Sequence, residues 1–403
     1  MSTSILYHGF GVRGYRYKRS HFEEGKIVFS IEKDSSSLRC PCCNDWHVNR
    51  RGGVFRWFQT LPIGGKQVYV ALHIPRVECR PCGVVRQIEI GFADPRRTYT
   101  KSFERYALEL SRHMTIQDVA RHLGVSWDVV KDILKRYLLK CYSKPRLKDL
   151  TLIAIDEISV GRGHRYLTVV LDLLSGAVVF VGDGKGADAL LPFWKRLKLS
   201  KAKVDAVAMD MSPSYISAVS THLPEATIVF DHFHIVKMFN DKLSEMRRDL
   251  QREAAEADKK VLKGTRWLLL KNPENLNDDK DEQQRLEAAL QFNKPLATAY
   301  YLKEDLRLLW LQKDKESAAT FLDGWIARAR SADIKMLDNF ANTLERHRAG
   351  ILAYYDYPIS TGPLEGTNNK IKTLQRQAYG FRDMDFFKLK IYALHETKYA
   401  LVG

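Results

Sequence analysis

The sequence contains no apolar run long and uninterrupted enough to span a membrane. Its most hydrophobic stretch, residues 166–181, is broken by Asp172 and by the turn signal Ser175-Gly176, so it predicts two strands and no membrane helix. No apolar leader core follows the first residues, which are mixed and basic. We therefore expect a cytoplasmic protein with no membrane partner.

Internal repeats and extended low-complexity tracts are also absent, and only residues 272–282 form a loose polar segment. Acidic residues are the scarcer charge, because 48 Asp and Glu stand against 64 Lys and Arg, a formal net charge of +16. Such an excess favours nucleic acid or an anionic membrane surface as the partner. The chain has 403 residues, 45% of them apolar, which is enough for two or three domains with substantial cores.

Cysteine is sparse, yet four of the six cysteines form two C-x-x-C pairs. In a cytoplasmic protein this spacing favours metal ligation over disulfides. The four thiolates of a tetrahedral structural zinc site would come from these residues: Cys40, Cys43, Cys79 and Cys82. Cys42 and His47 are rival ligands, and a set of unrelated buried cysteines is the alternative. We expect one zinc ion in a β-rich ribbon over residues 37–98, after an N-terminal segment of residues 1–36.

Basic and aromatic residues alternate within the expected ribbon. Between residues 50 and 97, nine Lys and Arg accompany three Asp and Glu, and Phe and Trp residues lie among them. This composition suits contact with phosphates, and Arg51 and Arg56 are candidate DNA contacts. The alternative is an ordinary core with a solvated rim.

Residues 115–138 have the pattern of two short helices that cross closely. Thr115 and Ser126 are candidate N-caps, and Gly124 separates the two helices. We predict a helix-turn-helix domain over residues 99–145, with an ordinary helical hairpin as the alternative. Three side chains would lie where the second helix meets DNA: Trp127, Lys131 and Lys135.

From residue 150 the pattern predicts three strands, a helix, a strand, a helix and a final strand that extends to Val236. This order is that of the RNase H-like fold, by analogy, and there the first and fourth strands lie side by side. Residues 240–357 are mostly charged amphipathic helix, which indicates a helical insertion or a dimerisation arm. Within them, Trp267 is either a core aromatic, which we favour, or a surface on which an unpaired base stacks.

Three acidic residues occupy positions where a metal-dependent phosphoryl-transfer site would need them. Asp156 and Asp210 each close a short apolar run, so we expect them at strand ends on one sheet edge. Glu365 follows the helix-start signal Gly362-Pro363 and should lie in the first helical turn. Converging carboxylates can hold two divalent cations, which clamp the attacking and leaving oxygens of a phosphodiester. For any one of these acids alone, a strand-end or turn role is the alternative.

Several polar residues should support these acids. Asn368, Asn369 and Lys372 share one helix face with Glu365 and could orient it or hold a phosphate. Asp231 also ends an apolar run, but its strand lies one position further from the site, so we favour Asp210 as the second acid. We expect His234 to be a strand-end histidine hydrogen-bonded to Asp231 and not a metal ligand.

Together these motifs resemble the bacterial insertion-sequence transposases of the DDE type. The resemblance covers nearly the whole chain and rests on the two cysteine pairs and the segments IAIDE, MDMSPSY, FDHFH and GPLEGTNNKIK. It implies an α/β RNase H-like catalytic core with a large all-α insertion, preceded by a small β-rich zinc ribbon and a helix-turn-helix domain. By matching position, Asp156, Asp210 and Glu365 resemble the catalytic triad, and Asp231 and His234 resemble a D-x-x-H motif between the last two acids.

The resemblance also implies a function and a domain plan. It implies metal-dependent cleavage and strand transfer of terminal inverted repeats into target DNA, with two Mg²⁺ or Mn²⁺ per site, by a homodimer associated with the bacterial nucleoid. The core would occupy residues 146–239 and 358–403, on either side of an insertion over 240–357. A non-catalytic DNA-binding regulator and another RNase H-like nuclease are the alternative functions.

Overall fold

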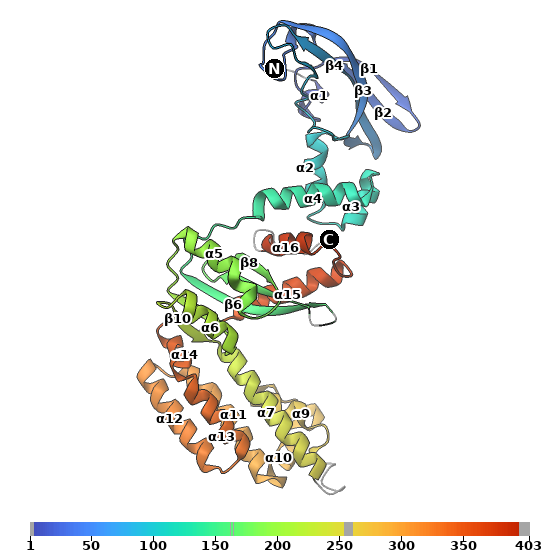
Figure 1. The fold of residues 1–403 in the computed structure, drawn as a ribbon. Helices are drawn as coiled ribbons and strands as arrows, with labels where there is room; N and C mark the ends of the chain where they lie inside the picture. Colours follow the sequence, from blue (N-terminus) through green and yellow to red (C-terminus); the bar gives the residue numbers. More distant parts are fainter. Residues whose placement is uncertain (1–3, 162, 164, 254–260, 395–403) are drawn as a thin grey trace. The chain divides into compact units, whose positions relative to one another are not determined.

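The computed structural model describes residues 4–161, 163, 165–253 and 261–394. The chain divides into two compact units, one formed by Met1–Ser143 with Thr373–Gly403 and the other by Lys144–Lys372. Figure 1 shows a β-sheet and helices in the first unit, and a sheet with a long helical bundle in the second. Within the described residues, no helix combines the length and the apolar character needed to cross a bilayer.

The first unit begins with α1 (Ile5–His8) and a twisted five-stranded sheet of order β1-β2-β4-β3, with β5 paired to β4. Its strands are β1 (Arg16–Glu23), β2 (Lys26–Glu32), β3 (Val48–Ile63), β4 (Lys66–Cys79) and β5 (Val85–Gln87). Strand β2 runs parallel to β4, and Ile27 and Ile31 bury their side chains in the same core as Leu72. The expected domain boundary at residue 36 would therefore divide one sheet. It is wrong, because the strands before and after residue 36 bury their apolar side chains in one core.

The helices of the first unit are α2 (Lys101–Leu110), α3 (Ile116–Leu123), α4 (Trp127–Tyr142) and α16 (Met384–Tyr392). The hydroxyl of Thr115 accepts a hydrogen bond from the backbone N–H of Asp118, which confirms the predicted cap of α3. Gly124 has the left-handed conformation, φ 63°, that ends this helix. Ser126 occupies the N-cap of α4 but makes no capping hydrogen bond, contrary to expectation.

Helix α16 packs against α4, although we expected the whole of residues 358–403 to complete the second unit. Phe386, Leu389 and Ala393 share a buried cluster with Val130 and Ile133 of α4. The physical reason is that α16 buries apolar side chains that α2, α3 and α4 leave uncovered. The helix-turn-helix region is thus completed by a segment from the far end of the sequence.

The second unit contains a five-stranded sheet of order β10-β9-β6-β7-β8. Its strands are β6 (Leu152–Gly161), β7 (Arg165–Asp172), β8 (Val178–Asp183), β9 (Ala206–Met209) and β10 (Thr227–Phe230), with α5 (Leu191–Ser200) and α6 (Pro213–His222) between the later strands. Strands β6 and β9 are parallel neighbours, which confirms the expected adjacency of the first and fourth strands. The predicted extension of the last strand to Val236 is wrong.

Strand β10 ends at Phe230 and α7 (His232–Glu253) begins two residues later. The Asp231 carboxylate accepts a hydrogen bond from the backbone N–H of Phe233, as helix N-caps do. Ile235, Phe239 and Leu243, spaced by four residues, bury one face of this helix. The apolar run that suggested a strand thus ends at Phe230, and the apolar spacing beyond Asp231 is helical.

The remaining described helices of this unit form a bundle around α7, drawn from yellow to orange in Figure 1. They are α9 (Arg266–Leu270), α10 (Glu282–Phe292), α11 (Lys294–Arg307), α12 (Lys315–Ser331), α13 (Lys335–Arg346) and α14 (Arg348–Leu352). Phe239, Trp325 and Phe340 pack edge to face at their centre, and the Trp325 indole N–H donates to the carbonyl of Leu302 at 2.9 Å. Helix α15 (Gly362–Gln377) follows this bundle.

Candidate functional site

Asp156 and Asp210 extend from neighbouring parallel strands. The register aligns Ala154 of β6 with Ala208 of β9, and two residues further along the chain lie Asp156, within β6, and Asp210, directly after the end of β9. We expected Asp156 to end its strand, and this is wrong, because β6 continues to Gly161 in a hairpin with β7. It lies instead just past the last residue that pairs with β9, which opens one side of the strand at this position.

The Asp156 carboxylate is held from two sides. One oxygen accepts a hydrogen bond from the backbone N–H of Glu157 at 2.7 Å, and the other accepts one from the side-chain amide of Asn368 at 2.8 Å. Burial raises the pKa of Asp156, the Glu157 hydrogen bond and His234 lower it, and the negative charge of Asp210 raises it further. A carboxylate that is disfavoured by burial and by a second carboxylate is one that a divalent cation would stabilise.

Glu365 and Asn368 lie one turn apart on α15. Glu365 is in the first turn, as predicted, and its side chain is exposed, whereas Asn368 is buried. Asn369 and Lys372 are exposed on the same helix. Apart from the four cysteines, the described residues bring no three His, Cys, Asp or Glu side chains within metal-sharing distance. Asn368 is therefore the direct link between the Glu365 helix and Asp156.

Asp231 is buried where β10 ends, with only 2% of its side chain exposed. Its backbone N–H donates to the carbonyl of Met209, and its carboxylate accepts the hydroxyl of Thr361, which directly precedes α15. His234 lies in the first turn of α7, and its Nε2 is 4.0 Å from the Asp231 carboxylate, too far for the expected hydrogen bond. Asp231 thus ties the start of the Glu365 helix to the strand beside Asp210.

Two polar side chains near this site were missed from the sequence. Thr361 directly precedes the helix-start signal, which places it to anchor that helix. The Tyr215 hydroxyl, within the segment MDMSPSY, donates to Glu157 at 3.2 Å and lies 3.1 Å from the hydroxyl of Thr168. Burial first, and then the charge of Glu157, raises the pKa of Tyr215 to about 12, so this tyrosine stays protonated and holds Glu157 in place.

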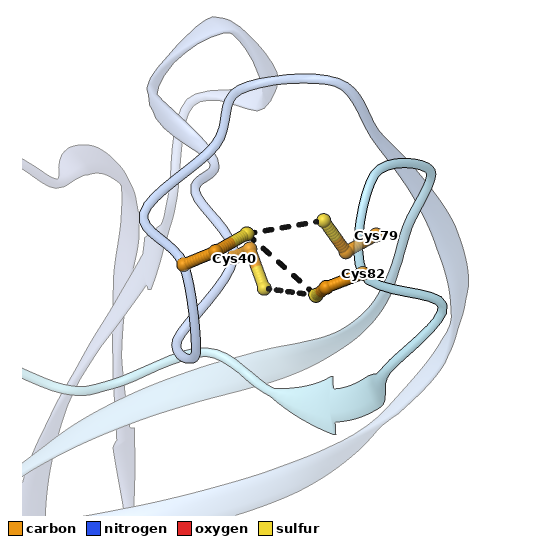
Figure 2. A group of neighbouring side chains, drawn as sticks. Cys40, Cys79 and Cys82 are labelled. Atoms are coloured by element: carbon orange, nitrogen blue, oxygen red, sulfur yellow. Dashed lines mark hydrogen bonds between the residues drawn. The ribbon is translucent and has the colours of Figure 1, made fainter.

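The two cysteine pairs meet at one point in the first unit, where Figure 2 shows Cys40, Cys79 and Cys82 directed toward one another. The β3–β4 hairpin brings them together, because it places Cys79 opposite Val48 and close to the loop that carries the first pair. Neighbouring sulfur atoms are 3.5 to 3.6 Å apart. Four ligands at the zinc–thiolate distance of about 2.3 Å in a tetrahedron would be separated by about 3.8 Å, so the cluster fits a metal ion.

The rival ligands lie outside this cluster. His47 is paired with Asp45, with 3.0 Å between its Nδ1 and the carboxylate, and Cys42 is exposed. The backbone hydrogen bond from Cys82 lowers the pKa of Cys79, but burial and the three neighbouring sulfurs together outweigh it and raise the pKa to about 12. Four thiols this close cannot all ionise without a cation between them.

The candidate DNA contacts of α4 are partly engaged within the protein. Lys131 and Lys135 both form ion pairs with Asp383, at 3.0 and 2.9 Å, and the Lys131 ammonium also lies over the Trp127 ring at 5.2 Å. Trp127 itself is 41% exposed at the start of the helix. Of the three, the tryptophan is the most available to a ligand.

The candidates in the first sheet differ in the same way. Arg51 is exposed and paired with Glu78 at 2.7 Å. Arg56 is half-buried, donates to the carbonyl of Arg97 at 2.8 Å and lies over the Phe58 ring in the core. Arg56 is therefore directed toward the core side of the sheet.

Trp267 is 65% exposed, so the favoured expectation of a core aromatic is wrong. Helix α9 buries Leu268 and Leu269 against the bundle and leaves Trp267 on its other side, where the Arg266 guanidinium lies over the ring at 4.9 Å. The exposed ring is accessible for the alternative, stacking on an unpaired base.

Comparisons with known proteins agree in pointing to one family. Residues 153–391 match the family model for the DDE transposases of ISL3, described as Transposase, and residues 88–138 match the helix-turn-helix domain of transposase family ISL3. The transposase for insertion sequence element IS1001 of Bordetella parapertussis is 33% identical over 392 residues, or 95% of this chain and 96% of that protein. The transposase for insertion sequence element IS1557 of Mycobacterium tuberculosis is 29% identical over 386 residues, or 89% of this chain and 86% of that protein.

A solved Drosophila P element transposase strand transfer complex is also similar, at 11% identity and a TM-score of 0.40, covering 76% of this chain and 94% of that one.

Proposed function

This chain belongs to the DDE transposases of family ISL3, and on that premise we propose that Asp156, Asp210 and Glu365 are its catalytic acids. The chain is an insertion-sequence transposase with a helix-turn-helix DNA-binding domain and a DDE domain that cleaves and transfers DNA. The proposal for Asp156 and Asp210 is supported by their adjacent positions past the β6–β9 pairing. For Glu365 it is supported by Asn368, one turn later on α15, whose amide holds Asp156.

The family implies a divalent metal, and we propose Mg²⁺ or Mn²⁺, two per site, held by these three carboxylates. Such ions supply Lewis-acid activation of the attacking oxygen and neutralise charge on the leaving oxygen. These cations prefer hard carboxylate oxygens as ligands. Burial disfavours the charge of one of the three carboxylates, Asp156, and a bound cation would stabilise it. For the cysteine cluster we propose one structural zinc ion, because its sulfur spacing fits tetrahedral coordination.

The protein's own polar residues would position these acids. Asn368 fixes one oxygen of Asp156 and leaves that carboxylate oriented toward α15. Asp231 holds Thr361, whose carbonyl accepts the backbone N–H of Glu365 at 2.8 Å. We therefore assign Asp231 to positioning Glu365, and His234, which lowers the pKa of Asp156, to favouring the ionised form of that acid.

We propose a separate role for each part of the chain. Residues 146–239 with the first part of residues 358–403 form an RNase H-like core, supported by the sheet order, and residues 240–357 form its insertion. The cysteine-bearing sheet and the helix-turn-helix bind the element's terminal repeats. Because two DNA ends must be joined, the active assembly would be a homodimer.

The test uses the full chain and a labelled duplex that carries the element's end. Asp156→Asn, Asp210→Asn and Glu365→Gln should each abolish Mg²⁺-dependent strand cleavage while the dissociation constant for the end changes by less than about threefold. The amides keep the shape of the acids but remove the charge that holds cations. Glu225→Gln, which neutralises an exposed acid of the same unit, is the matched control and should cut normally. Full cleavage by any one of the three variants removes that residue from the triad.

A further inference from the structure

One open face of the first sheet combines aromatic and basic side chains to which the proposed function gives no individual role. The register aligns Arg19 of β1 with Ser30 of β2, Ser30 with Ala71 of β4, and Ala71 with Trp57 of β3, so these residues face the same side. Phe55 pairs with His73 on that side. Together they line a depression of about 840 Å³.

The aromatic rings of this face are open to a ligand. Phe55 is 59% exposed, and Trp57 is half-buried between His21 and Tyr69, with ring centroids 6.5 and 5.6 Å apart. The strand bends here at a bulge around Gly53, where an added Cβ would lie 2.5 Å from the His73 ring. Glycine at this position therefore leaves room for the His73 imidazole, which a larger residue would displace.

The charge of this face is positive. Among the residues that the structure describes, Arg19 and Arg50 have no ion-pair partner, and Glu32, the acid that lines the depression, is already paired with Arg16 and Lys18. His21 adds a buried Nδ1 that has no hydrogen-bond partner. A ligand that carries both acceptors and flat apolar rings would satisfy all three features.

The same face continues to the helix-turn-helix. Gln59, two residues beyond Trp57 on β3, donates to the carbonyl of Leu123 at 2.7 Å, and Gln67 of β4 donates to that of Gly124 at 3.3 Å. These contacts attach one end of the sheet face to the turn that precedes α4. DNA held by that helix would therefore have its continuation close to the aromatic depression.

We propose that this face binds a DNA strand with unpaired bases, which stack on Phe55 and Trp57 while Arg19 and Arg50 contact the backbone phosphates. The proposal rests on the DNA-binding role of this unit but is independent of the three acids. Stacking on aromatic rings tolerates any base and needs the base to be out of the duplex. Duplex DNA would offer its phosphates to the arginines but no ring face to Phe55 and Trp57.

The test measures binding of the full chain to one labelled oligonucleotide, single-stranded and as a duplex, by fluorescence anisotropy. Phe55→Leu and Trp57→Leu should each weaken single-strand binding about tenfold, since one stacked base contributes about 5- to 150-fold in affinity. Binding to the duplex should change by less than about twofold. Trp57→Phe, which keeps a ring, should restore most of the single-strand affinity.

Trp46→Leu is the matched control, because Trp46 is 66% exposed in the same unit and does not line the depression. It should bind both oligonucleotides as the parent does, and equal thermal unfolding of all variants confirms that the fold is kept. The proposal is overturned if Phe55→Leu and Trp57→Leu leave single-strand binding unchanged, or if they weaken duplex binding as much. Failure of the catalytic assignment would appear instead as normal cleavage by the acid variants, with this binding intact.

Discussion

The buried pair of Asp231 and Thr361 should couple the stability of the second unit to its cleavage rate. Thr361 is 1% exposed and directs its hydroxyl to the Asp231 carboxylate, which is 2% exposed. Replacing Thr361 with Val keeps the shape of the side chain and removes the hydrogen-bond donor. Asp231→Ala removes the acceptor and leaves the threonine hydroxyl buried without it.

The magnitude follows from burial. A hydrogen bond to a charged, buried group contributes about 1.5–3 kcal/mol, and a buried polar group left without a partner costs about 1–3 kcal/mol. We expect Thr361→Val to lower the free energy of unfolding by about 1–3 kcal/mol and Asp231→Ala by somewhat more, because it also loses the hydrogen bond from Phe233 at 3.3 Å. Since both variants remove the same interaction, the double variant should fall short of their sum by about 1 kcal/mol or more.

Urea denaturation of the two single variants and the double variant measures this coupling, and cleavage of a labelled end measures its effect on the site. Both single variants, and likewise His234→Ala, should cut more slowly but at a measurable rate, because Glu365 would be less well placed and the acids would remain. A coupling near zero would contradict the anchoring role. So would an Asp231→Ala variant of normal stability with no cleavage, since that pattern belongs to a metal ligand.

Two further predictions concern the first unit. Cys79→Ser should release the metal and unfold the cysteine-bearing end of the sheet, since metal binding and folding are coupled. Metal analysis of the freshly purified parent chain should find about one zinc ion per chain. A parent chain without zinc would refute the site. Asp383→Asn should lower the free energy of unfolding by about 1 kcal/mol and, by freeing Lys131 and Lys135, tighten DNA binding at low salt. Burial opposes the ionisation of Asp383, but hydrogen bonds from Lys135, the Phe386 backbone and Lys131 lower its pKa below 3.8, so its stabilisation is present above that pH and is lost as the pH falls below it. Acid unfolding should therefore be less steep in Asp383→Asn, and an unchanged profile would show that the ion pairs contribute nothing.

Local patterns predicted much of the fold because the relevant interactions are short in sequence. Thr115 and Gly124 act within one or two turns, and the helix start at Gly362 needs only its own neighbours. The adjacency of β6 and β9 was also expected, and it is what brings Asp156 beside Asp210. The helix that begins at His232 was missed because further apolar residues follow the run that ends at Phe230, and only their four-residue spacing is helical.

The contacts of the charged side chains depended on pairings that no local pattern contains. Lys131 and Lys135 are satisfied by Asp383, about 250 positions away in sequence, so their exposure to DNA could not be judged from α4 alone. The same holds for Asn368, which meets Asp156 across 212 positions. A positive net charge indicates that DNA is the partner, but only the folded chain separates paired cations from available ones.

Strand β3 shows how the alternation of side chains along a strand decides which of them a ligand can reach. Arg56 and Phe55 are adjacent in sequence, and in a strand adjacent side chains point to opposite faces. Burial of Phe58 in the core fixes Arg56 on the same side, which leaves Phe55 and Trp57 on the open one. From the sequence, the interleaved arginines and aromatics looked equally suited to DNA. Because Phe58 is buried, the alternation places Arg56 on the core side, where it contacts Arg97 and Phe58. It places Phe55 and Trp57 on the surface that a DNA strand can reach.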